Sequence, residues 1–69
     1  MTQKELLYIE DAIGHECNII TICEDTISRL EDESLISFLE SEIKKHKSMK
    51  KDLIDMLEVN SNEWSSVNG

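Results

Sequence analysis

The spacing of the apolar residues constrains the fold of this chain more than any other feature. In the first part of the chain, intervals of three and four positions separate Leu6, Ile9, Ile13, Ile20, Cys23, Ile27 and Leu30, apart from one gap. This spacing places them on one stripe of an α-helix, as in coiled coils and helical bundles. Thr2 and Glu5 have the spacing of a capping box, so we expect a helix of about 28 residues that begins near residue 3.

A second helix is predicted after the acidic turn 31–34, because Asp32 can accept the free amides of a first helical turn. Its apolar stripe comprises Leu35, Leu39, Met49, Leu53 and Met56, widened by Ile36, Phe38, Ile43, Ile54 and Leu57. So short a turn favours antiparallel neighbours. The periodicity is lost from Asn60 onwards, which predicts a helical hairpin over 1–59 and a flexible C-terminal tail over 60–69.

Composition supports an all-α fold and predicts self-association. The 69 residues are 39% apolar and include two glycines and no proline. Two helices that share one stripe bury too little apolar surface to offset the entropy of ordering the chain. We therefore expect an antiparallel two-helix hairpin that forms a homodimer or a higher homo-oligomer. The homodimer would be a four-helix bundle. The predicted oligomer seam is Ile9, Ile13, Ile20, Ile27, Leu39, Met49 and Leu53.

Charge, apolar run length and cysteine spacing limit the partners and the compartment that we expect for this chain. A net charge of −8 disfavours nucleic acid, and no apolar run is long enough for a membrane span or a secretory signal. Five bases do cluster over 44–51, at Lys44, Lys45, Lys47, Lys50 and Lys51. They are interpreted as a solvated face or as an intersubunit band that pairs with Glu10 and Asp11, rather than as an anion site. Cys17 and Cys23 point in different directions on one helix and indicate unpaired thiols in a reducing compartment such as the cytoplasm.

Two polar residues interrupt the apolar stripes and are the candidate site. Glu16 fills the gap in the first stripe, and His46 lies on the second. We expect Leu30 to lie level with Leu35 across the turn, so that residues whose numbers sum to about 65 face each other. Glu16 is then level with Met49 and one turn from His46. Three hypotheses follow: an ion pair that fixes the register, a solvated rim, or a metal clamp for zinc or iron in which a two-fold axis joins two Glu16 and two His46. No nucleophile has a base and an orienting acid in a recognisable pattern, so we expect no enzyme.

The segment 4–16, Lys-Glu-Leu-Leu-Tyr-Ile-Glu-Asp-Ala-Ile-Gly-His-Glu, resembles the opening of short spore-coat proteins of the coat-F-like, ferritin-like type. The turn 31–35, Glu-Asp-Glu-Ser-Leu, also matches that family's acidic turn. The resemblance covers residues 3 to 58. Gly14 and Glu16 match the small residue and the glutamate of the family's first helix. Where ferritin-like members have Glu-x-x-His on the second helix, this chain has His46 and Met49, which argues against a di-iron site.

The resemblance implies a non-enzymatic structural or interaction protein, cytoplasmic or in the spore coat, that acts by self-association. One alternative is a degenerate ferritin-like metal site, made by Glu16 and His46 at a dimer axis. Another is a small regulatory hairpin that docks one helical face on a signalling protein. Partners in these hypotheses are a second copy, other coat proteins or signalling proteins.

Overall fold

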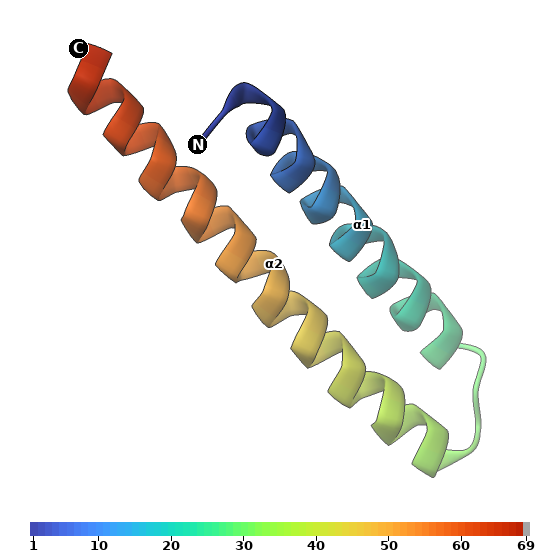
Figure 1. Cartoon of the computed structure of the whole chain (residues 1–69). Coiled ribbons are helices and arrows are strands. Elements are labelled where there is room, and N and C mark those ends of the chain that lie inside the picture. The colour runs from blue at the N-terminus through green and yellow to red at the C-terminus, as the bar shows by residue number, and fades with distance from the viewer. Residues whose placement is uncertain (69) are drawn as a thin grey trace.

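Two helices form the fold of the described chain. In the computed structural model, α1 spans Gln3–Ile27 and α2 spans Glu33–Asn68. The structure describes the backbone of residues 1–68 and the side chains of residues 1–60. The helices lie side by side, run in opposite directions and are joined by residues 28–32 (Figure 1). No strand is present in residues 1–68, so the all-helical prediction is confirmed.

The predicted capping box starts α1. The Thr2 hydroxyl accepts a hydrogen bond from the backbone N–H of Glu5 at 3.1 Å, and the Glu5 carboxylate accepts one from the backbone N–H of Thr2 at 2.8 Å. The pKa of Glu5 is lowered because the ionised carboxylate is the better acceptor for the Thr2 amide. Two amides that the helix leaves without partners are thereby satisfied.

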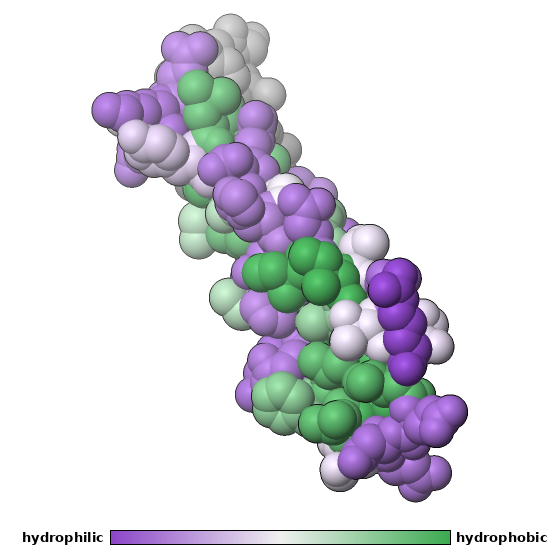
Figure 2. All heavy atoms as spheres, turned by 90° about the vertical axis from the view of Figure 1, so that its right-hand side faces the viewer, coloured by the Kyte–Doolittle hydropathy of each residue, from purple (hydrophilic) through white to green (hydrophobic). Residues whose placement is uncertain are grey.

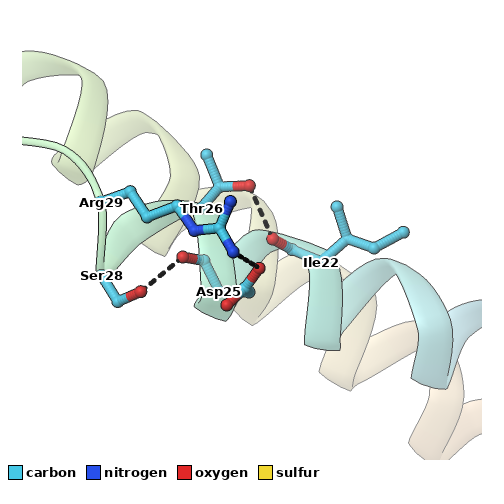
Figure 3. A network of polar contacts seen from close by, with 5 residues as sticks. All are labelled: Ile22, Asp25, Thr26, Ser28 and Arg29. Atoms are coloured by element: carbon cyan, nitrogen blue, oxygen red, sulfur yellow. Dashed lines mark hydrogen bonds and ion pairs between the residues drawn. The ribbon is translucent and has the colours of Figure 1, made fainter.

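The end of α1 lies earlier than the apolar spacing predicts. The helix has 25 residues and ends at Ile27, so Leu30 lies in the connection. The Ser28 hydroxyl donates to the carbonyl oxygen of Asp25 at 2.6 Å, and the Arg29 guanidinium pairs with the Asp25 carboxylate at 3.3 Å (Figure 3). These contacts close the last turn, because the carbonyls at a helix end lack intrahelical partners.

Asp32 starts α2, as predicted. Its Oδ1 accepts hydrogen bonds from the backbone N–H of Ser34 at 2.9 Å and of Leu35 at 3.1 Å, and from the Ser34 hydroxyl at 2.6 Å. The pKa of Asp32 is lowered, first by the Ser34 hydroxyl and then by the two amides. The carboxylate therefore acts as an N-cap that favours its ionised form.

The helix α2 continues beyond the N-terminal end of α1 (Figure 1). Its 36 residues account for the long axis of the molecule, whose extents are 54 × 16 × 13 Å. The boundary predicted at residue 60 lies inside this helix, because residues 33–68 contain neither proline nor glycine to end it. The side chains of the predicted tail from residue 61 onwards, and all of Gly69, lie outside the described residues.

The two helices contact each other along one inward stripe each. On α1 the stripe is Leu6, Ile9, Ile13, Glu16, Ile20, Cys23 and Ile27, and on α2 it is Ile36, Leu39, Ile43, His46, Lys50, Leu53 and Leu57, all buried or half-buried. Ile20 and Ile43 are the most buried apolar residues, 7% and 9% exposed. A single seam thus supplies the hairpin with a very small core.

The α2 stripe differs from the predicted one. Leu35, Met49 and Met56 are about half exposed, at 51%, 49% and 50%. The inward positions are those of Ile36 and Leu39 and the residues that follow each at intervals of seven, which include the polar residues His46 and Lys50. The prediction placed His46 on the stripe but followed hydrophobicity otherwise, whereas the helix turns at a fixed angle and therefore carries Lys50 inward as well.

Gly14 faces open space within the chain. A Cβ atom at this position would meet nothing within 4 Å, so the close helix approach suggested by a mid-helix glycine does not occur inside the hairpin. Gly14→Ala should therefore raise the free energy of unfolding by about 1 kcal/mol, through helix propensity alone. Urea denaturation of the two proteins measures this difference. A loss of stability would show instead that another chain packs against Gly14.

The Asp32 cap predicts a pH dependence. Since its pKa in the folded chain is lowered, the cap stabilises the fold fully above the ordinary aspartate pKa, and the stabilisation is lost as pH falls below about 4. Asp32→Ala should lower the melting temperature at pH 7, and the difference from the wild type should shrink as pH falls through this range. Asp32→Asn, which retains a capping oxygen, is the control. A difference that does not change with pH would contradict this assignment.

Candidate functional site

Glu16 and His46 form a contact at the centre of the seam. The Nδ1 atom of His46 lies 2.5 Å from Oε2 of Glu16. The Glu16 side chain is 11% exposed and that of His46 is 22% exposed, so both groups are largely removed from water. An ionised carboxylate has no proton to give, so with Glu16 ionised the His46 Nδ1–H donates the hydrogen bond. The geometry is that of the predicted structural pair, and it excludes the solvated rim.

The pair sets the register of the two helices. Within residues 1–60 it is the only hydrogen bond between a side chain of α1 and one of α2. The numbers of its two residues sum to 62 rather than the predicted 65, so Glu16 is level with His46 and not with Met49. The prediction counted from Leu30 as the last residue of a helix, but α1 ends at Ile27 and the connection is longer. A one-position shift would leave both polar groups buried without a partner.

Within one chain this pair supplies too few ligands to hold a metal ion. The described residues contain no group of three or more His, Cys, Asp or Glu side chains placed to share an ion. Oε2 and Nδ1 are directed at each other, which leaves Oε1 and Nε2 as the free donor atoms. The predicted zinc or iron clamp therefore requires a second copy to bring further ligands to these atoms.

A groove runs along one side of the seam. Its volume is about 500 Å³, and it is lined by Cys17, Ile20, Thr21 and Glu24 from α1 and by Lys47, Lys50, Lys51 and Ile54 from α2. Lys51 also pairs with Asp55 at 2.7 Å, which raises the pKa of the lysine. Three of the five clustered lysines thus border this groove. Of the other two, Lys45 pairs with Glu42 at 3.3 Å on the surface, as expected for a solvated face.

The other side of the seam exposes apolar side chains. With the inward residues as heptad positions a and d (Leu6 and Ile36 at a), the groove is lined only by residues at a, b and e. Eight of the ten large apolar side chains exposed among the described residues lie at c or g: Tyr8, Ile19, Ile22, Leu35, Phe38, Met49, Met56 and Val59. In antiparallel helices the two g positions flank the same side of the seam, opposite the two e positions. We call this side the apolar face, and the e and b side the groove face.

The space-filling view agrees with an incomplete core. In Figure 2 hydrophobic residues reach the surface at mid-length and near the turn, between hydrophilic residues. The apolar face was not predicted, because Leu35, Met49 and Met56 were assigned to the inward stripe of the second helix. The signal that could have found the face was present, since these three residues are separated by multiples of seven positions and each directly precedes a residue of the inward set.

The remaining predicted residues lie as their sequence positions suggest. His15 is on the surface, where it pairs with Asp11 at 3.4 Å. Cys17 and Cys23 are free thiols and half-buried. Within the described part of the chain, neither helix contains a segment long and apolar enough to cross a membrane.

Comparison of the chain with protein-family models, curated proteins and solved structures finds no match. The resemblance to coat-F-like proteins therefore stays a prediction.

The buried pair predicts strong coupling between its two members. Glu16→Leu and His46→Leu should each lower the free energy of unfolding by about 1–3 kcal/mol, because each leaves a buried polar group without a partner. The double variant should regain most of this loss, since two apolar residues suit the seam. A double-mutant cycle in urea measures the coupling. The exposed Lys51–Asp55 pair is the control, and Asp55→Ala should change stability little.

Additive effects in this cycle would contradict a structural pair. A melting temperature that rises with added zinc or iron, and that His46→Ala returns to the metal-free value, would support the metal hypothesis instead.

Proposed function

We propose that this chain is a non-enzymatic protein-interaction module that works by self-association of its hairpin into a four-helix bundle. The observation that carries the proposal is the surface left uncovered by a two-helix fold. The accessible surface is 5437 Å², whereas a compact monomer of this mass exposes about 4,450 Å². The excess of about 1,000 Å² is comparable to the roughly 800 Å² that each partner buries in a standard interface.

The predicted seam residues support this proposal from inside the hairpin. Six of the seven lie on the inward stripes, and all but Ile20 remain half-exposed in the single chain. Met49 is the seventh and lies on the apolar face. In a four-helix bundle, helix positions beside the seam become core as well, so a second hairpin would complete the burial of the same side chains.

The resemblance to coat-F-like proteins suggests where such a module would act. Self-association of a helical hairpin suits a structural role of the kind those proteins have, in the cytoplasm or in a spore coat. The proposal includes neither catalysis nor a cofactor, because it assigns Glu16 and His46 to the interior of the bundle as a structural pair.

Sedimentation equilibrium tests the proposal directly. The purified protein should sediment as a species of at least twice the chain mass of 8.0 kDa, and to the same extent with zinc or iron added or with a chelator. Dilution should dissociate it reversibly. A single-chain mass at all concentrations would contradict self-association, and assembly only with metal would favour the metal hypothesis.

A further inference from the structure

The two sides of the hairpin differ enough to decide which one a second copy covers. We infer that two copies pair through the apolar face and leave the groove face open to solvent; this inference rests on the proposed self-association. The partner is thus a second copy of this chain, and the surface is the set of c and g positions on both helices.

The apolar face has the composition of a bundle interior. Its eight large exposed side chains come from both helices and extend from Tyr8 to Ile22 on α1 and from Leu35 to Val59 on α2. The exposed fractions of the most accessible members, Ile22, Tyr8 and Phe38, are 63%, 62% and 60%. Patches of this kind on a small protein mark sites of association, because burying them removes apolar surface from water.

Charge also favours this face. The chain has fifteen acids and seven bases, but within residues 3–27 and 33–60 of the helices only Glu5, Glu42, Lys45 and Asp52 among them occupy c or g positions. Glu42 and Lys45 neutralise each other across 3.3 Å, and Glu5 is engaged in the capping box. Two copies can therefore approach along this face with little of the repulsion that a net charge of −8 would otherwise cause.

The groove face is a poor interface for a second copy. Eight charged residues lie at its e and b positions within the helices: Glu10, Glu24, Glu33, Glu40, Lys44, Lys47, Lys51 and Glu58. Leu7 is its one large apolar side chain with high exposure among the described residues. Burying this face would remove several charges from water without sufficient partners, which costs more than the Coulombic attraction returns.

Matched substitutions on α1 test which face is buried. Ile22 on the apolar face and Leu7 on the groove face are 63% and 58% exposed in the hairpin, so glutamate at either site is tolerated by the single chain. Ile22→Glu should weaken self-association by about 100-fold, since it buries an unpaired charge between copies. Leu7→Glu should leave it unchanged. Met49→Glu, on the same face of α2, is a second variant and should behave like Ile22→Glu.

The readout is the dissociation constant for self-association, measured by sedimentation equilibrium. Circular dichroism at protein concentrations above this constant measures the helical content of each variant. Weakening by Ile22→Glu and Met49→Glu, with Leu7→Glu as tight as the wild type, supports the inference. Equal affinities for all four proteins, or weakening by Leu7→Glu alone, overturns the face assignment while self-association stands. A wild type that is a monomer at every concentration overturns the proposed function as well.

Discussion

A two-helix hairpin has only one seam in which to bury apolar side chains, and this limit governs the rest of the structure. The inward stripes of α1 and α2 bring Ile20 and Ile43 close to full burial, while most other inward side chains stay half-exposed. Small folds of this size usually need disulfides, metals or a partner chain. The two cysteines are unpaired, and no cluster of metal-binding side chains forms within the described residues. A partner chain would bury the half-exposed side chains of the seam further, which is why self-association is the function that we propose.

The Glu16–His46 pair reduces the apolar surface buried in the seam but favours a single register of the two helices. It occupies two positions near the middle of a seam that has few apolar residues to lose. Buried ionic groups seldom add net stability, because the cost of removing them from water offsets their attraction. They do penalise every arrangement in which they fail to meet. In a hairpin whose stripes repeat every seven residues, apolar contacts alone would tolerate a slip of one heptad, and the pair makes such a slip costly.

The two outer sides of the seam have opposite character, and this asymmetry limits how copies can assemble. Lysines and acids occupy the groove face, while the apolar face carries eight large exposed side chains from both helices. An association that uses one face of each copy closes on itself as a dimer, whereas two equivalent apolar faces would allow open-ended assembly. The groove face presents charges to solvent, and the proposed pairing therefore uses the other side.

Local signals in the sequence determined the elements of this fold. The capping box at Thr2 and Glu5, the Asp32 cap and the spacing of the α1 stripe depend on neighbours within one or two helical turns. They were predicted correctly, apart from Leu30 at the end of the stripe, which lies in the connection. The pairing of Glu16 with His46 was found as a hypothesis, because two polar residues on apolar stripes need an explanation. The register, the true α2 stripe and the apolar face depend on where α1 ends and on how the helices turn toward each other. Only the tertiary structure decided them, since a shift of one position in α2 changes which side chains face inward without changing any local signal.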